Sequence, residues 1–203
     1  MTGRVEVATI EQALALRQPM LLGRQPGERA AAVAAVVRDR PSGAEVLLIR
    51  RAARDGDPWS GHMAFPGGRA EPADHDLQAT ARRETREEVG LDLGRFARSI
   101  GRLDDVPAIA RGRRVGLTIS PFVFALLEEP PLVHNEEVEE LLWAPLDPLL
   151  SGAAATSIKY AFEGHELTLP ALDVRGRVVW GLTYRMLESL FEALRASPAT
   201  TAG

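Results

Sequence analysis

Three glutamates stand close together in a segment with strong helical character. Glu84, Glu87 and Glu88 are spaced i, i+3 and i+4, so on a helix all three lie on one face. Carboxylates crowded in this way repel one another, and a hard, oxygen-seeking cation such as Mg²⁺ or Mn²⁺ relieves that repulsion. Glu84 and Glu88 stack one turn apart and are the best candidates for direct ligands, with Glu87 as a further one. Taken alone, the same spacing also suits a solvated helix face.

A glycine loop precedes this helix. Pro66, Gly67 and Gly68 are expected to end regular structure and to let the backbone approach a ligand closely. The Gly68 carbonyl is a candidate metal ligand, and Gly67 is a candidate substrate contact. Arg83 precedes Glu87 by four residues, so we expect it to orient that carboxylate through an ion pair. Loop and helix together predict a cation site that can hold a diphosphate.

The joint pattern resembles the Nudix box of the Nudix hydrolases. In that box a glycine, an acid and then Arg-Glu-x-x-Glu-Glu-x-Gly follow at set spacings. Here Phe-Pro-Gly-Gly occupies 65–68, and Arg-Glu-Thr-Arg-Glu-Glu-Val-Gly-Leu occupies 83–91. The second half departs from the box at Thr85, where an aliphatic residue is usual. His75 stands where a glutamate is usual, and Asp74 supplies an acid one residue earlier.

This offset, with Phe-Pro-Gly-Gly in front, is similar to the Nudix branch that cleaves coenzyme A and its thioesters. Asn-Glu-Glu-Val at 135–138 and Val-Trp-Gly-Leu-Thr at 179–183 resemble that branch too. The branch also carries Leu-Leu-Thr-x-Arg-Ser, a further arginine and a glycine ahead of Phe-Pro-Gly-Gly. This chain has Leu-Leu-Ile-Arg-Arg-Ala at 47–52, with Arg54 and Gly61 after it. The Thr and Ser are missing, and the spacing is a residue longer.

The resemblance implies a pyrophosphohydrolase that uses Mg²⁺ or Mn²⁺ and attacks a diphosphate with water. Coenzyme A or a thioester is the favoured substrate, giving adenosine 3′,5′-bisphosphate and 4′-phosphopantetheine. ADP-ribose, nucleotide sugars and nucleoside triphosphates are the alternatives within the family. A regulatory module that binds a nucleotide without catalysis is a further alternative, and the three retained glutamates argue against it. The resemblance also allows a homodimer.

The catalytic base has two candidate sources, because related enzymes take it either from the box or from a later loop. Glu84 and the acidic stretch 136–140 therefore compete, and Glu137 is preferred within that stretch. Glu87 completes the set of candidate catalytic carboxylates.

Arginines near these segments are candidates for binding phosphate, because guanidinium pairs bidentately with phosphate oxygens. The candidates are Arg50, Arg51, Arg54 and Arg83. Strand-end surface charge is the alternative for the first three. Trp59 could stack on a base or on pantetheine, although packing is the more frequent role of a loop tryptophan. Trp180 is expected in the core.

The elements that must position these residues combine strands and helices. Strands at 31–37 and 45–51 could pair as a hairpin, and a short strand is expected at 62–65. Small or apolar residues recur every four positions over 77–89, which predicts the best helix of the chain. Further expected elements are strands at 99–103, 117–127 and 139–143, a hairpin at 158–162 and 166–169, and helices at 10–16, 146–150 and 180–194.

This mixture implies an α/β or α+β fold, and the resemblance implies a Nudix-type α/β/α sandwich with a mixed β-sheet. We expect an N-terminal extension with a short helix over residues 1–27. The Nudix hydrolase domain is expected over residues 28–196, and a frayed C-terminal tail over residues 197–203.

Composition narrows the classes of protein further. The chain has 203 residues, and its net charge of -4 is too even for a nucleic-acid binder. The lack of cysteine excludes disulfides, zinc thiolates and cysteine nucleophiles. Charged residues interrupt the N-terminus, unlike in a signal peptide, and no apolar run suits a membrane span. We therefore expect a cytoplasmic protein that acts on a small nucleotide diphosphate, with no nucleic-acid or membrane partner.

Overall fold

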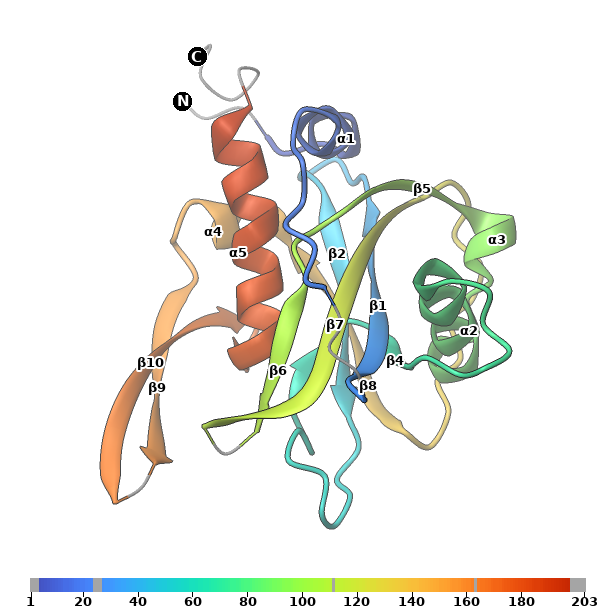
Figure 1. Cartoon of the computed structure of the whole chain (residues 1–203). Coiled ribbons are helices and arrows are strands. Elements are labelled where there is room, and N and C mark those ends of the chain that lie inside the picture. The colour runs from blue at the N-terminus through green and yellow to red at the C-terminus, as the bar shows by residue number, and fades with distance from the viewer. Residues whose placement is uncertain (1–3, 24–26, 111, 163, 198–203) are drawn as a thin grey trace.

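The computed structural model describes residues 4–23, 27–110, 112–162 and 164–197. In these residues an eight-stranded mixed sheet lies between helices on both faces (Figure 1), which confirms the predicted sandwich. A separate three-stranded antiparallel sheet projects from one side of the molecule. Apart from residue 197, the predicted C-terminal tail lies outside the described residues.

The centre of the large sheet is β1 (Arg29–Arg38), which pairs in parallel with β7 (Arg113–Leu126) and antiparallel with β2 (Glu45–Arg51). Alternate residues of a strand point to opposite faces. In β1 both faces are apolar and buried, so the strand contributes to two cores. Its small side chains, mostly alanine and valine, leave room for a helical layer on each side.

The other strands extend this centre. β3 and β8 pair with β2, β4 pairs with β1, and β5 and β6 pair with β7. Their bounds are Met63–Ala64 (β3), Gly67–Arg69 (β4), Ala97–Arg102 (β5), Val106–Ala110 (β6) and Val138–Pro145 (β8). The projecting sheet consists of β9 (Ala155–Phe162), β10 (His165–Val174) and β11 (Arg177–Trp180).

Helix α2 (Leu77–Val89) covers one face of the sheet, next to β1 and β4. The Asp76 carboxylate accepts from the backbone N–H of Ala79 at 2.7 Å and caps its start. Gly90 ends it in the left-handed conformation, with φ of 71°. The two short helices are α3 (Leu93–Phe96) and α4 (Leu146–Leu150).

The opposite face is covered by α1 (Val7–Ala15) and α5 (Gly181–Ala196), which pack against each other (Figure 1). The buried residues of α1 belong to the same core as those of α5, so the segment predicted as an extension packs against the domain. Arg17 reinforces the contact, because its guanidinium pairs with Asp104 and donates to the Ser189 hydroxyl at 3.0 Å. No helix among the described residues is long and apolar enough to span a membrane.

Most of the predicted elements are present. β2, α2 and α4 have the predicted bounds, and β1 and β2 form the predicted hairpin. The prediction that Gly67 and Gly68 end regular structure is wrong, because they form β4 and pair with Val33 and Ala32 of β1. Three other short elements, α3, β6 and β11, were not predicted; their few residues lack a clear period.

Candidate active site

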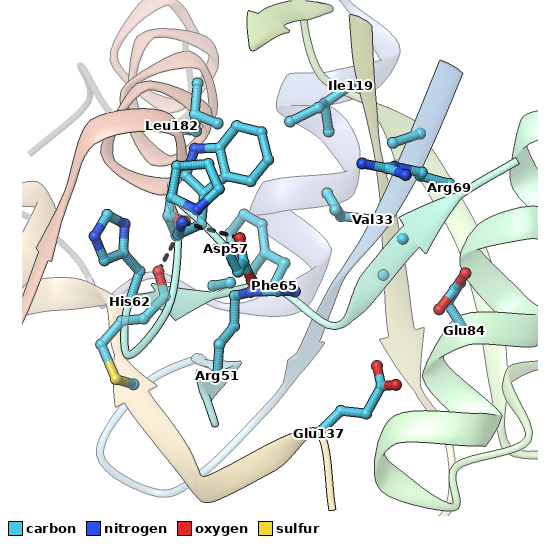
Figure 2. A pocket seen from close by; sticks show the side chains of 18 of the residues that line it. Val33, Arg51, Asp57, His62, Phe65, Arg69, Glu84, Ile119, Glu137 and Leu182 are labelled. Atoms are coloured by element: carbon cyan, nitrogen blue, oxygen red, sulfur yellow. Dashed lines mark hydrogen bonds and ion pairs between the residues drawn. The ribbon is translucent and has the colours of Figure 1, made fainter. Parts of the chain in front are cut away.

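A pocket of about 580 Å³ opens between α2, the sheet and the start of α5. The 52–61 loop, between β2 and the segment leading to β3, forms one of its sides. Figure 2 shows Glu84 and Glu137 on one side of the pocket, and Leu182 and His62 on the other. Glutamates thus line one end of the cavity, and apolar residues together with Asp57 line the other.

The acidic end consists of Glu84, Glu88 and Glu137, all of which line the pocket. Glu88 is 2% exposed, and its carboxylate accepts from the backbone N–H of Gly67 at 2.8 Å. Burial raises the pKa of Glu88 to about 7, and the charges of Glu84 and Glu137 act in the same direction. Burial also raises the pKa of Glu84. These mutually repelling carboxylates are therefore a destabilised group that a cation would relieve.

The two glycines of β4 make this crowding sterically feasible. A Cβ atom at Gly68 would lie 2.5 Å from the carboxylate carbon of Glu84, so the missing side chain is the space that the Glu84 carboxylate fills. Gly67 has φ of +150°, and a Cβ there would lie 2.3 Å from the carbonyl oxygen of Ala32. Glycine is therefore required at both positions, by the site at Gly68 and by strand pairing at Gly67.

Arg83 joins the segment before α2 to the carboxylates on it. Its guanidinium binds both oxygens of Asp74 at 3.0 Å and donates to Glu84 at 3.0 Å. It also donates to Glu87 at 3.1 Å and to the Arg69 carbonyl at 2.9 Å. These hydrogen bonds hold the pKa of Asp74 well below its usual range.

Three of the predicted site residues, Arg83, Glu87 and Arg50, do not line the pocket. Arg83, predicted as a substrate contact, does not line it, and the five hydrogen bonds above use all five N–H groups of its guanidinium. Glu87 also lies outside the lining and is half exposed. Neighbouring residues of a strand point to opposite faces, so Arg50 points away from the pocket that Arg51 lines. Arg50 pairs instead with Glu139 at 3.0 Å.

Arg51 and Arg54, two of the candidate phosphate-binding arginines, line the pocket. Arg51 donates to Asp57 at 2.8 Å, while its buried Nε has no hydrogen-bond partner. Its charge lowers the pKa of Glu88, against the larger effect of burial. Arg54 donates to Glu137 at 2.9 Å. The two guanidiniums thus stand between the loop and the acidic end.

Glu137 comes from the turn before β8 and is held near α2 by backbone contacts. The backbone N–H of Asn135 donates to the Glu88 carbonyl at 3.0 Å, and the Asn135 side chain accepts from the backbone N–H of Glu137 at 2.9 Å. The Glu137 carbonyl in turn accepts from Ala52 at 2.8 Å. In the acidic stretch 136–140, Glu137 is the glutamate that lines the pocket.

The opposite end is an apolar wall, which the sequence did not predict. We give this name to Trp59, Ile119, Trp180, Leu182 and Met186. Trp180 was expected in the core, but it lines the pocket with its ring centroid 4.7 Å from that of His62. Burial lowers the pKa of His62, so the imidazole beside the wall is neutral near pH 7. In the sequence, the segment 179–183 through its resemblance, and Trp59 as a candidate for stacking, hinted at this end.

The acidic end fits a divalent cation in its donor chemistry. Two carboxylates one helical turn apart and a glycine strand beside them offer the oxygen ligands that Mg²⁺ and Mn²⁺ prefer. No three Asp, Glu or His side chains in the described ranges already stand close enough together to hold an ion. Instead, the Glu84 carboxylate accepts a hydrogen bond from Arg83, and the Glu88 carboxylate accepts one from the backbone N–H of Gly67.

Comparisons with known proteins agree with this geometry. The NUDIX domain family matches residues 28–163, which is more than half of the chain. A protein of Yersinia pestis, described as the uncharacterized Nudix hydrolase NudL, is 31% identical over 163 residues, covering 80% of this chain and 78% of its own length. An uncharacterized protein of Schizosaccharomyces pombe is 44% identical over 117 residues and 56% of this chain. The match spans only 36% of that longer protein.

Two solved structures share the fold at low sequence identity. A MutT/nudix family protein from Enterococcus faecalis superposes with a TM-score of 0.53 at 18% identity, over 93% of this chain and 68% of its own. The NUDIX domain of NrtR from Shewanella oneidensis, solved with ADP ribose, gives a TM-score of 0.50 at 16% identity, over 89% of each chain. These similarities concern the arrangement of the sheet and its helices.

Proposed function

This chain belongs to the Nudix hydrolase family, and on that premise we propose that it hydrolyses the diphosphate bond of coenzyme A or one of its thioesters. The products would be adenosine 3′,5′-bisphosphate and 4′-phosphopantetheine. The observation that carries the proposal is that acidic box residues, Glu137 and two arginines line the same pocket. The coenzyme A preference is supported by the sequence resemblance around 47–68 and 179–183.

We assign Glu84 and Glu88, with the Gly68 carbonyl, to hold a divalent cation, Mg²⁺ or Mn²⁺. Such an ion supplies charge neutralisation on the diphosphate and lowers the pKa of water. Glu87 lies outside the pocket lining and pairs with Arg83, so we assign it a positioning role, which is to orient Arg83 on the face of α2. Arg83 holds Glu84 in place without touching substrate.

The proton of the attacking water goes to Glu137 in this proposal. Glu137 lies on the same side of the pocket as Glu84 (Figure 2), and its side chain is 43% exposed, so water reaches it. The hydrogen bond from Arg54 orients its carboxylate. Arg51 and Arg54 then donate to the diphosphate oxygens, where a planar guanidinium binds two of them at once.

The test is a panel of coenzyme A, ADP-ribose and a nucleoside triphosphate, each with Mg²⁺ or Mn²⁺, with products separated by chromatography. We expect the two coenzyme A products, and their loss in Glu88→Gln. Glu128→Gln is the matched control, because Glu128 is exposed and remote from the pocket. Cleavage of another compound alone would keep the hydrolase and reject coenzyme A. No cleavage of any compound would favour a binding module.

A further inference from the structure

Among the described residues, Arg69 is the arginine of the pocket without a carboxylate partner. Of the other arginines that line the cavity, Arg51 pairs with Asp57 at 2.8 Å. Arg54 pairs with Glu137 at 2.9 Å. The exposed guanidinium of Arg69 makes no hydrogen bond or ion pair within the described part of the chain. Its charge is therefore available to a ligand in the pocket.

The Arg69 side chain starts close to the acidic end but leaves from the other face of β4. A Cβ at Gly68 would lie 2.5 Å from the carboxylate carbon of Glu84, so the Cα of Arg69 is within about 8 Å of that carbon. Neighbouring residues of a strand point to opposite faces, so Arg69 points away from Glu84. Strand register places Arg69 in one row with Ala31 and Ile119, and Figure 2 shows it close to Ile119. A group bound by Arg69 is thus a neighbour of the diphosphate and not part of it.

A second arginine joins Arg69 on this face. Arg29 precedes Ala31 by two residues in β1, and Ala31 is opposite Arg69. Arg29 and Arg69 are therefore diagonal neighbours on one face, with Cβ atoms on the order of 7–8 Å apart. The Arg29 guanidinium donates to the Val115 carbonyl at 3.2 Å, and no carboxylate in the described ranges pairs with it.

The charge of this surface suits a dianion. Glu71, the first acid after Arg69, lies 3.8 Å from Arg83 instead. Arg29 and Arg69 thus keep two positive charges without a carboxylate. A phosphomonoester carries about two negative charges at pH 7 and three acceptor oxygens, which guanidinium groups bind in bidentate pairs. The apolar side chain of Ile119 beside Arg69 lowers the local dielectric and strengthens this attraction.

We propose that Arg29 and Arg69 form a subsite for a phosphomonoester that the substrate carries next to its diphosphate. The inference rests on the proposed hydrolase function and names a group by which the pocket selects its substrate. In coenzyme A this group is the phosphate at the 3′ position of the ribose, a few bonds from the diphosphate. NADP⁺ carries the same group at the 2′ position. A compound without it leaves both guanidinium groups in water.

The test uses two pairs of compounds that differ only in this phosphomonoester. Coenzyme A is compared with 3′-dephospho-coenzyme A, and NADP⁺ with NAD⁺, by kcat/KM with Mg²⁺ or Mn²⁺. We expect coenzyme A to be preferred over its dephospho form by at least about tenfold, because hydrogen bonds between charged groups are lost without the phosphate. Arg69→Gln should abolish this preference, and Arg29→Gln should reduce it. Arg95→Gln is the matched control, since Arg95 is exposed and does not line the pocket, and it should keep the preference.

A binding measurement separates the subsite from catalysis. Calorimetry in EDTA gives the Kd of each compound for the wild type and for Arg69→Gln. Tighter binding of the phosphorylated compounds, lost in Arg69→Gln, without cleavage of any compound would support the subsite and overturn the proposed function. A preference confined to NADP⁺ would support the subsite and reject coenzyme A.

Two outcomes would overturn the subsite. The first is cleavage with equal kcat/KM and equal Kd within both pairs, which would leave the hydrolase intact. The second is an equal loss of kcat/KM for both members of a pair in Arg69→Gln, because Arg69 would then bind the diphosphate itself.

Discussion

The two ends of the pocket are constructed in different ways. At the acidic end, Glu84, Glu88 and the neighbouring Gly68 come from one stretch of chain, and Glu137 joins them from the turn before β8. At the other end, the apolar wall takes Trp59 from a loop, Ile119 from β7 and three residues from the β11–α5 junction. Glu84 and Glu88 are thus encoded locally, whereas the apolar wall depends on how distant elements pack. A change in one distant element can therefore alter the apolar wall while Glu84 and Glu88 keep their places on α2.

The largest expected effect tests whether the acidic end depends on strand pairing. Gly67→Ala should lower the free energy of unfolding by at least about 3 kcal/mol, because its Cβ collides with backbone of β1. Urea unfolding measures this. Gly23→Ala, where nothing lies within 4 Å, should be nearly neutral. An equally stable Gly67→Ala would mean that β4 and β1 are not so closely apposed.

The next effect concerns pH. In the folded, metal-free chain Glu88 stays protonated up to about pH 7, whereas in the unfolded chain it ionises near pH 4.5. The folded state thus binds more protons between these values, so stability falls as pH rises from about 4.5 to 7. The loss is up to about 3 kcal/mol.

Glu88→Gln cannot ionise and still offers an oxygen to Gly67. It should match the wild type near pH 4.5 and exceed it in stability at pH 8. Urea unfolding in EDTA at several pH values measures the difference. Parallel pH profiles for the two proteins would show that Glu88 does not titrate abnormally.

Gly68→Ala separates placement of the carboxylate from stability. Its Cβ would meet only the flexible end of Glu84, so the fold should tolerate it while the Glu84 carboxylate moves. A misplaced catalytic group costs about 100-fold in rate, and we expect kcat to fall by that factor. Steady-state kinetics beside a thermal melt measure both quantities. Unchanged kcat would argue against Glu84 as a metal ligand.

The smallest effect tests the loop. Asp57→Asn removes the charge that orients Arg51, so KM for the diphosphate should rise about tenfold while kcat changes little. Asp55→Asn, an exposed acid in the same loop, is the matched control and should leave KM unchanged. A fall in kcat with constant KM would instead place Asp57 in the chemical step.

The same contrast explains how much could be predicted from the sequence. Helix α2 and its glutamates follow from residue spacing, because helical geometry fixes which side chains share a face. β2 and its hairpin with β1 were also predicted from local pattern. The ion pair between Arg83 and Glu87 was predicted and is present, but the position of Glu87 outside the pocket lining was not predicted, because helical spacing alone does not say where the pocket opens.

Contacts between distant segments gave no local signal. No residue near Trp180 in the sequence indicates that its ring will contact His62 at one end of a pocket, since His62 lies more than half the chain away. Asp57 lies in a loop that departs from the family pattern, so its bonds to Arg51 and Trp59 could be seen only in the folded chain. The Gly67–Arg69 strand was missed because glycine has low strand propensity.

The packing of α1 against α5 also has a consequence for the order of folding. Arg17 and Ser189 are separated by 172 positions, yet they share a hydrogen bond. Closing so long a loop is entropically costly, and contacts of high sequence separation slow folding. We therefore expect the layer of α1 and α5 to assemble last, after α2 has packed on β1. During synthesis, the apolar face of α1 then lacks α5 as a partner until nearly the whole described chain has emerged, although β5, its other neighbour, emerges much earlier.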